Sequence, residues 1–576
     1  MHSYPINCFY DTYKMKHCIP LFICLMGFSV ACTQTGTELR YIASDHPFAL
    51  VYVLDSNDRL QPADTLVRGM VVEVNTDNCI RRNKVEYVAL QMHKPTYYIE
   101  ENLTVNNPDE TVLESRLFAR TPASVIDDTL TSHICGQTLK GEPYDILGFD
   151  YLNPDGTVNR YRIRYGKQEG YVYGKYAVQS QEEALAHYMP EWQDSIHAKV
   201  KNTFRGGEAV GCDFFPHEKP RFIGNIMPDP CYSLYLNISP AVIGKIDDYI
   251  ALAKQTRINT FVIDIKDNEC PGYKADAMEK YSPTNYKWGG KNKKAMYDYA
   301  VRRLHEEGFY VVGRITCFKD TYFVKDHPEC AITEKATGQP FYHNKAHWPS
   351  PYDRSVWQFN VELAKEAVRT FGFNEINFDY VRFPDRMNSV EDLIDYHNTY
   401  GETKVQAIQR FVQYACDELH SLQAYVSIDV FGESANKGYT TPYGQYWPAL
   451  SNIADVMCGM PYPDHFASGY AGLKKPWNHP YQTLNVWGKS VQSRQAETPS
   501  PAKVRTWIQA YPVMRYVDPE GIDYNAANIE KAVRGLFDAG CRDGYITWLS
   551  SSSLSRYTSQ APAFSIDYTQ PGTNNE

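Results

Sequence analysis

The fold is decided by the stretch NEINFDYVRFPD, residues 374–385, in which polar and apolar side chains alternate. The polar set is Glu375, Asn377 and Asp379, and apolar residues stand between its members. Alternation with a period of two is typical of a β-strand, whose successive side chains point to opposite faces. A carboxylate on a buried face is costly unless it has partners, so Asp379 indicates chemistry at the end of this strand.

Seven more strand-like stretches flank this one, and helix-compatible sequence follows each strand except the last. In chain order the eight are SLYLNIS, TFVIDIKD, FYVVGRITCF, EINFDYVRFP, AYVSIDVFG, ADVMCGMPYP, VRTWIQAY and GYITWLSSS. Two of the helical stretches end at Gly308 and Gly372, as a left-handed C-cap prefers. Alternating strands and helices predict a parallel sheet. Eight βα units over residues 230–556 predict an α/β fold of the (β/α)8 TIM-barrel type.

All-β sequence precedes the predicted barrel. Residues 33–112 and 113–180 are β-rich, residues 181–229 are expected to form a helical linker, and residues 557–576 a C-terminal tail. The segment GEPYDILGFDYLNPDGTVNRYRIRYGKQEGYVYGKYAV, residues 141–178, resembles a bacterial SH3 domain, and residues 33–112 resemble a weaker copy. The resemblance implies a module that tethers an enzyme to the cell wall or to another protein. A structural spacer is the alternative.

The first 32 residues have the pattern of a lipoprotein signal peptide. An apolar run from Ile19 to Ala31, too short to span a membrane, follows Met15 and a basic residue and ends before Cys32. We therefore expect Met15 to be the true start and Cys32 to carry a lipid, which would anchor the protein in the bacterial envelope, in the periplasm or at the outer-membrane surface. Secretion after ordinary cleavage nearby is the alternative.

Composition argues against several classes of partner and cofactor. The formal net charge is −10 and no cluster of Lys and Arg stands out, which argues against nucleic acid as a partner. None of the cysteines after Cys32 has CxxC spacing, so no metal site is predicted. We expect no cofactor.

Parity places further polar and aromatic residues at the barrel mouth, where the strands end. Besides Asn377 and Asp379, the expected set is Asp264, Lys266, Arg314, Arg382, Asp429, Tyr462, Asp464, His465, Gln509 and Trp548.

Two carboxyl groups facing one site are what glycosidic bond cleavage needs. One attacks the anomeric carbon or activates water, and the other protonates the leaving oxygen. Aromatic rings at the rim would stack on sugars.

Several motifs, VIDIKD, EINFDYVRFP, DVFG, MPYPDHF and WIQAY, carry a family resemblance over residues 230–555. They resemble those of a largely uncharacterised family of bacterial proteins predicted to be glycoside hydrolases, with barrels similar to the α-amylase and α-galactosidase types. The resemblance implies Asp379 as the nucleophile. It leaves the acid open between Asp429, which stands where the α-amylase type has Glu, and Asp464, which matches the α-galactosidase type.

We therefore predict a glycoside hydrolase that acts on a poly- or oligosaccharide at the bacterial envelope, with Asp379 and Asp429 as the catalytic pair. Arg382 is expected to orient Asp379 or an anionic group of the substrate. One alternative is a barrel that binds polysaccharide or peptidoglycan without cleaving it. Another is a metal- or Schiff-base-dependent barrel, with Lys266 as the reacting amine.

Overall fold

The computed structural model describes residues 36–44, 48–91, 95–113, 116–128, 133–153, 156–186, 209, 211–268, 270–290, 293–387, 389–436 and 441–570. The chain divides into two compact units. One consists of residues 1–113 with 148–159, and the other of residues 114–147 with 160–576. In the described ranges, no helix is both long enough and apolar enough to cross a membrane. The signal peptide and Cys32 lie outside the described residues.

The first unit contains one seven-stranded sheet with the order β3-β2-β6-β5-β4-β1-β7. Its strands are β1 (Thr37–Ile42), β2 (Phe48–Leu54), β3 (Leu60–Val67), β4 (Val71–Arg82), β5 (Val85–Leu90), β6 (Tyr97–Glu100) and β7 (Thr104–Val105). Its core is small and aliphatic, built on Ile42, Val51, Val74, Val88 and Ile99. The expectation that residues 33–112 are β-rich is therefore confirmed.

The second unit begins with another seven-stranded sheet, ordered β10-β9-β13-β12-β11-β8-β14. Its strands are β8 (Arg116–Ala119), β9 (Ser124–Ile126), β10 (Ile134–Gln137), β11 (Pro143–Phe149), β12 (Arg160–Tyr165), β13 (Gln168–Tyr173) and β14 (Ala177–Val178). The hydroxyl of Tyr176 donates to Asp417 and that of Tyr173 to Glu418, so this sheet is hydrogen-bonded to a helix of the following α/β part. Of the expected helical linker, the described residues contain only the short helix α2 (Gln181–Leu185).

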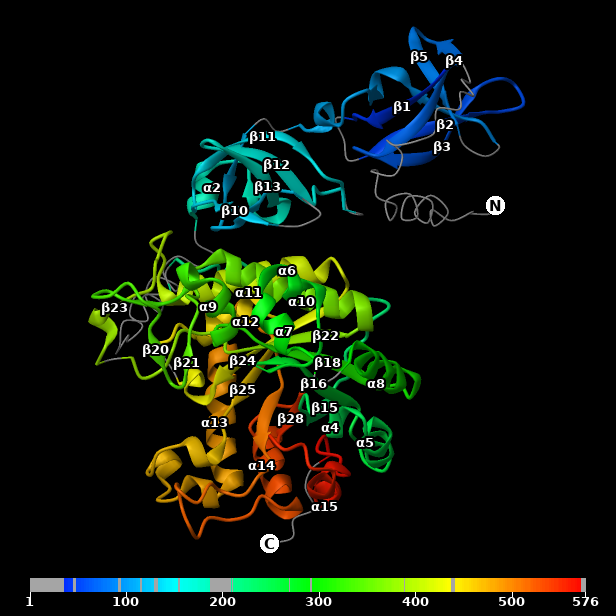
Figure 1. Ribbon diagram of the computed structural model, residues 1–576. Coiled ribbons are helices and arrows are strands. Elements are labelled where there is room, and N and C mark those ends of the chain that lie inside the picture. Colours follow the sequence, from blue (N-terminus) through cyan, green and yellow to red (C-terminus); the bar gives the residue numbers. More distant parts are fainter. Residues whose placement is uncertain are drawn as a thin grey trace. The chain divides into compact units, whose positions relative to one another are not determined.

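From residue 231 onward the chain forms a parallel barrel (Figure 1). The strands are β15 (Cys231–Leu236), β16 (Thr260–Asp267), β18 (Tyr310–Thr316), β22 (Glu375–Asp379), β24 (Tyr425–Phe431), β25 (Val456–Met460), β26 (Lys503–Val504), β27 (Thr506–Gln509) and β28 (Gly544–Trp548). They pair in parallel in the order β26-β25-β24-β22-β18-β16-β15-β28-β27, so β28 returns to β15, and β26 and β27 are the two ends of the sheet. Only Arg505 separates β26, which pairs with β25, from β27, which pairs with β28. The sheet is therefore nearly closed on itself.

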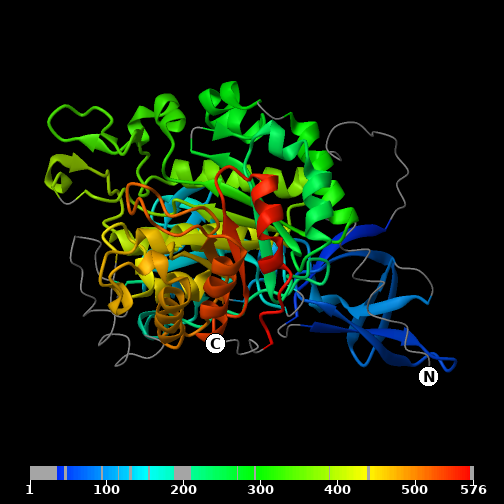
Figure 2. The same ribbon diagram turned by 90° about the horizontal axis from the view of Figure 1, so that it is seen from below.

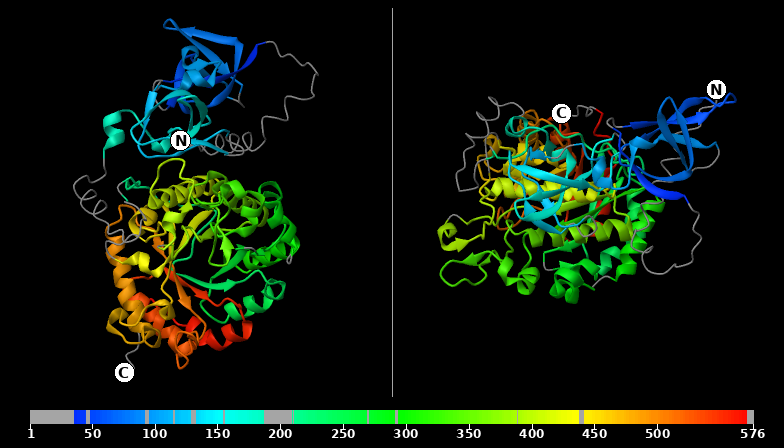
Figure 3. Two further views of the ribbon diagram at one scale, coloured as in Figure 1. Left: turned by 60° about the vertical axis from the view of Figure 1, so that its left-hand side comes forward. Right: turned by 90° about the horizontal axis from the view of Figure 1, so that it is seen from above.

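Helices surround these strands, as the left view of Figure 3 shows for the green-to-red part of the chain. They are α4 (Pro240–Ile243), α5 (Ile246–Ala253), α6 (Asp276–Tyr281), α7 (Pro283–Trp288), α8 (Lys294–Glu306), α9 (Thr321–Asp326), α10 (Arg354–Phe371), α11 (Lys404–His420), α12 (Trp447–Ile453), α13 (Pro480–Gln495), α14 (Ala526–Asp538) and α15 (Leu554–Phe564). Gly308 and Gly372 follow α8 and α10 with φ of 81° and 80°, so both predicted glycine caps are confirmed.

The end of the chain differs from the sequence expectation. Helix α15 follows the last strand and includes residues that were assigned to a tail from 557 onward. Tyr557, Phe564 and Tyr568 are buried against the barrel helices. The pattern escaped recognition because Pro562 lies inside the helix.

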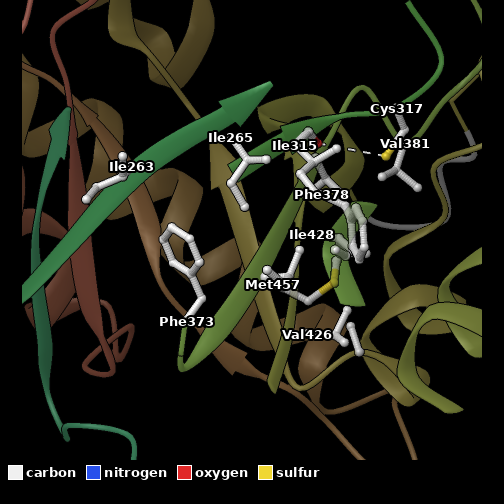
Figure 4. Packing of buried hydrophobic residues seen from close by; sticks show 14 of the residues in the cluster. Ile263, Ile265, Ile315, Cys317, Phe373, Phe378, Val381, Val426, Ile428 and Met457 are labelled. Carbon is white, nitrogen blue, oxygen red and sulfur yellow. Dashed lines mark hydrogen bonds between the residues drawn. The ribbon is translucent and has the colours of Figure 1, made fainter. Parts of the chain in front are cut away.

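Side-chain parity along the strands separates two layers, as predicted. Figure 4 shows the outer layer, in which Phe378, Ile428 and Met457 pack between the strands and the helices. The inner layer fills the barrel with larger and more polar side chains, including Tyr235, Tyr310 and Trp507. The polar face of residues 375–379 therefore points into the barrel.

Two enlarged loops extend from one side of the barrel mouth, following β18 and β22 (Figures 1 and 2). They pair through β19 (Thr333–Glu334) and β23 (Ile394–Asp395), and the first also holds β20 (Tyr342–His343) and β21 (Ala346–His347). Ile332, Trp348 and Met387 are buried between them. The two loops thus form one small packed body beside Asp379.

Candidate active site

Arg314, on β18, is the centre of the carboxylate cluster at the barrel mouth. Its Nη1 donates to Oδ1 of Asp264 at 2.6 Å, and its Nη2 donates to Oδ2 of Asp379 at 2.5 Å. Its Nε lies 3.7 Å from Oδ2 of Asp429. The guanidinium also lies over the Trp548 ring, 5.6 Å from its centroid. The structure therefore brings together four of the residues that parity placed at the mouth and gives them a shared cation.

Asp379 is the last residue of β22, and each of its carboxylate oxygens accepts a hydrogen bond. Besides Arg314, the backbone amide of Tyr380 donates to its Oδ1 at 2.6 Å. Tyr380 has a φ of 52°, so the backbone turns sharply just after Asp379. The side chain is 9% exposed, which leaves one edge open. A charged, hydrogen-bonded carboxylate at the strand end can act as a nucleophile or as a base.

Asp429, on β24, has the opposite character. Its Oδ1 accepts from Nδ2 of Asn377 at 2.9 Å and from Nε1 of Trp507 at 2.7 Å. Its buried Oδ2 has no hydrogen-bond partner among the described residues. Burial, followed by the negative charge of Asp379, holds the pKa of Asp429 well above its usual value. The raised pKa favours the protonated form of Asp429, as the acid of an acid and base pair requires.

Asp264 and Asp267 are two further carboxyl groups of the cluster, both on β16. Asp264 accepts from the Tyr235 hydroxyl as well as from Arg314, and burial raises its pKa to about 7. Oδ1 of Asp267 lies 3.5 Å from Nη1 of Arg314. The sequence analysis missed Asp267, because strict alternation from Asp264 would direct residue 267 outward.

A β-bulge explains the position of Asp267 and corrects the prediction for Lys266. The register of β16 against β18 shifts between Asp264 and Lys266, so one extra residue lies on β16. Lys266 therefore faces the surrounding helices, where its Nζ donates to Oδ2 of Asp320 at 2.8 Å and lies over the Phe359 ring. A buried, ion-paired ammonium at this position does not face the carboxylate cluster.

Asp464 lies at the rim, after β25, with both oxygens engaged. The Tyr511 hydroxyl donates to its Oδ1 at 3.0 Å, and the Met514 amide donates to its Oδ2 at 3.3 Å. Burial raises its pKa. Gln509 accepts from the Asp464 amide at 3.4 Å and donates to the Tyr511 carbonyl at 3.2 Å, so it holds these two loops together.

Aromatic rings line the same side of the rim. The ring of Tyr462 stacks with that of Trp548, with centroids 6.4 Å apart, and meets the ring of His465 edge-on at 5.2 Å. Trp548 is partly exposed and the His465 side chain is 47% exposed. These three rings are the expected aromatic contacts for a sugar, and the structure brings them together next to Arg314.

Arg382 does not contact Asp379, which corrects the prediction that it orients this carboxylate. Its Nη1 donates to Oδ1 of Asp385 and to the carbonyl of Phe383, both at 3.1 Å. Aromatic rings surround the guanidinium, namely those of Trp348, Tyr380, Phe431 and Tyr443. Arg382 thus fixes the loop after β22 by packing and by a local ion pair.

Glu375, at the other end of β22, forms a separate buried pair. Arg505 binds both of its oxygens, at 2.7 and 3.2 Å, and the Tyr310 hydroxyl donates to it at 3.1 Å. The sequence analysis placed Glu375 inside the barrel but missed Arg505. This ion pair lies inside the barrel at the beginning of β22, whereas the candidate catalytic residue Asp379 lies at the end of the same strand.

A family model covers most of the barrel. Residues 233–554, more than half of the chain, match the family model described as "Putative glycosyl hydrolase domain". No curated protein sequence matches the chain. Among solved structures, the chain is similar to a hypothetical protein from Ruminiclostridium thermocellum, at 30% identity over 34% of this chain and 97% of that one, with a TM-score of 0.30.

Two further solved structures are similar at lower identity. The glycoside hydrolase domain of PgaB (BpsB) from Bordetella bronchiseptica is 11% identical over 59% of this chain and 99% of that one, with a TM-score of 0.41. The chitobiase of Flavobacterium johnsoniae is 11% identical over 58% of this chain and 48% of that one, with a TM-score of 0.38.

Proposed function

The chain belongs to the "Putative glycosyl hydrolase domain" family, and from this premise we propose that it hydrolyses an O-glycosidic bond in a poly- or oligosaccharide. Asp379 is the nucleophile or base, and Asp429 is the acid. The observation that carries the proposal is the contrast between two carboxyl groups around Arg314. Both oxygens of Asp379 accept hydrogen bonds, whereas Oδ2 of Asp429 accepts none from the described residues and the pKa of Asp429 is raised.

In the proposed reaction, the two carboxyl groups together break one glycosidic bond and transfer one proton. Asp379 attacks the anomeric carbon or removes a proton from the attacking water, while the bond from that carbon to the leaving oxygen breaks. Asp429 transfers its proton to the leaving oxygen, so both products leave with complete hydroxyl groups after water has added. Arg314 orients Asp379 through its hydrogen bond and compensates the charge that appears on Asp429.

Asp464 is the less suitable acid. Both of its oxygens already accept hydrogen bonds, from the Tyr511 hydroxyl and the Met514 amide. Protonation of either oxygen would disturb one of these bonds, whereas the free Oδ2 of Asp429 can carry a proton without such a loss. The Asp464→Asn variant is therefore the informative comparison with Asp429→Asn, and we expect the larger loss of turnover in the latter.

The direct test is a product assay on the purified protein. Reducing ends and product masses would be measured with α-glucans, galactosides, host glycans and peptidoglycan as substrates. We expect one class to be cleaved by the native protein and not by Asp379→Asn. Binding of a glycan by both proteins with no product from either would contradict hydrolysis and favour a barrel that only binds polysaccharide.

The raised pKa of Asp429 predicts the pH dependence of turnover. Since the acid must be protonated, kcat/KM should fall as pH rises through the raised pKa of Asp429, giving an alkaline limb. The Tyr235→Phe variant removes a hydrogen-bond donor to Asp264 and leaves the partners of Asp429 in place. The alkaline limb of its kcat/KM profile should therefore stay at the same pH as in the native protein. The measurement is kcat/KM across pH 5–9. A limb that moves in Tyr235→Phe would assign the titration to Asp264 instead.

We further propose that the enzyme acts at the bacterial envelope, anchored through a lipid on Cys32, with an SH3-like module that binds the cell wall or a partner protein. The short apolar run before Cys32 supports the anchor. Expression of the native chain and of Cys32→Ser in a bacterial host tests it. The native protein should sediment with membranes and the variant should not, whereas equal distribution would contradict lipidation.

A further inference from the structure

A second cluster of reactive side chains lies at the opposite end of the barrel from Asp379. Cys416 and His420 stand one helical turn apart near the end of α11, and Asp455 directly precedes β25. Their ligand atoms, Sγ, Nε2 and a carboxylate oxygen, all lie within 4.8 Å of one another. None of the three takes part in the proposed hydrolysis.

Each group in this cluster is placed to face the others. Nε2 of His420 lies 2.8 Å from Oδ2 of Asp455. Oδ1 of Asp455 is buried and has no hydrogen-bond partner within the described part of the chain. The thiol of Cys416 is buried and lies 3.8 Å from the carbonyl oxygen of Ile453, a weak hydrogen bond. A buried carboxylate oxygen without a partner is costly, which indicates that something else satisfies it.

We propose that Cys416, His420 and Asp455 bind one Zn²⁺ ion. A thiolate, an imidazole and a carboxylate form a ligand set of intermediate softness, which suits Zn²⁺ better than Mg²⁺ or Ca²⁺. Binding forms a bond from zinc to sulfur and releases the thiol proton to solvent. The His420 side chain is 23% exposed, so water can reach the fourth position.

The neighbouring lysine is compatible with this ion. Nζ of Lys219 donates to the carbonyls of Ser451, Asn452 and Ala454 at the end of α12, so its position is fixed by these three bonds. Burial lowers the pKa of Lys219 to about 8. Its three N–H groups are all engaged by carbonyl oxygens, so the lysine does not occupy Oδ1 of Asp455.

The position assigns the ion a structural role. α11 runs antiparallel to the strands, so its last turn meets the beginning of β25, and zinc would join the helix to that strand. Residues at this end of such barrels serve stability, whereas the strand ends that carry Asp379 serve chemistry. The sequence did not indicate this group, because its cysteine has no CxxC partner and Asp455 lies far along the chain from Cys416 and His420.

Another Cys and His group provides the matched control. His327, Glu329 and Cys330 also lie within ligand distance of one another. Glu329 is 69% exposed, and Nε2 of His327 is already bonded to the Tyr281 carbonyl at 2.7 Å. This group is less suited to a metal, so Cys330→Ser should leave zinc binding unchanged.

The experiment uses the full chain with its thiols kept reduced. Zn²⁺ would be titrated against a chromophoric chelator, and Co²⁺ would be added separately to detect a thiolate-to-metal charge-transfer band. We expect about one ion per chain, a band from thiolate ligation, and a rise in Tm on adding zinc. Cys416→Ser and His420→Gln should each weaken binding at least about 10²-fold and abolish the rise in Tm.

Three outcomes would overturn the proposal. They are no stoichiometric binding by the native chain, a cobalt band that persists in Cys416→Ser, and a band that is lost in Cys330→Ser. His420→Gln covers the case in which Cys416→Ser does not fold, because His420 is partly exposed. Turnover is a separate readout: Asp379→Asn should bind zinc as the native chain does, so failure of the hydrolase proposal would not alter the result.

Discussion

Asp379→Asn is expected to lower kcat by about 10³-fold or more on the substrate that the product assay identifies. The amide keeps the shape of the side chain, but its single oxygen can accept from only one of the two donors, Arg314 or the Tyr380 amide. It cannot attack an anomeric carbon or remove a proton from water at a useful rate. Positioned acids and bases contribute about 10²–10⁴-fold to turnover, and loss of the nucleophile removes at least that much.

The control for this variant is Asp395→Asn, in β23 of the loop body beside the mouth. The Asp395 side chain is 52% exposed and accepts from the His397 amide at 2.8 Å, remote from Arg314. We expect its kcat and KM to match those of the native protein. Asp395→Asn should unfold at the native temperature, whereas Asp379→Asn, which removes one partner of a buried ion pair, should unfold at a lower temperature but be folded under the assay conditions. Native turnover in Asp379→Asn would exclude this residue from the chemistry.

Arg314→Met is expected to cost about 3–5 kcal/mol of unfolding free energy and to abolish turnover. Methionine fills much of the same space but leaves Asp264, Asp379 and Asp429 without their shared cation. Breaking a buried ion pair from one side is costly because the remaining charges stay buried and uncompensated. Urea unfolding at fixed pH measures the loss, and Arg386→Met, whose side chain is 87% exposed, should remain within about 0.5 kcal/mol of the native protein.

The loss in Arg314→Met should depend on pH in a defined direction. Asp264 and Asp429 already have pKa values above their ordinary ones, and removal of the cation raises them further. A group with a raised folded-state pKa favours the folded state below its unfolded pKa, and this contribution is lost as pH rises through the folded value. The deficit of Arg314→Met should therefore be larger at pH 8 than at pH 5. An equal deficit at both would show that lost packing, and not charge, dominates.

The position of Arg314 explains why the prediction that Arg382 orients Asp379 was wrong. Arg382 is three positions from Asp379, and proximity in the chain favoured it. In the fold, Tyr380 turns the backbone, so Arg382 is directed into the aromatic rings and Asp385, while Arg314 reaches Asp379 from the adjacent strand. Neighbours across a parallel sheet are close in space and far apart in sequence.

What the sequence determined by itself was the order of strands and helices and the inward face of each regular strand. These properties are local, since period-two alternation and helical spacing are fixed by neighbouring residues. They were sufficient to place Asp379, Asp429, Asn377 and Trp548 at one end of a barrel. The tertiary structure decided what local pattern cannot encode. Because of the bulge in β16, Asp267 and not Lys266 lies near Arg314. Arg505 pairs with Glu375 across the barrel interior. Burial and the charge of Asp379 on the adjacent strand raise the pKa of Asp429, whereas its contacts with Asn377, Trp507 and Arg314 oppose that rise. All of these are set by side chains distant in sequence.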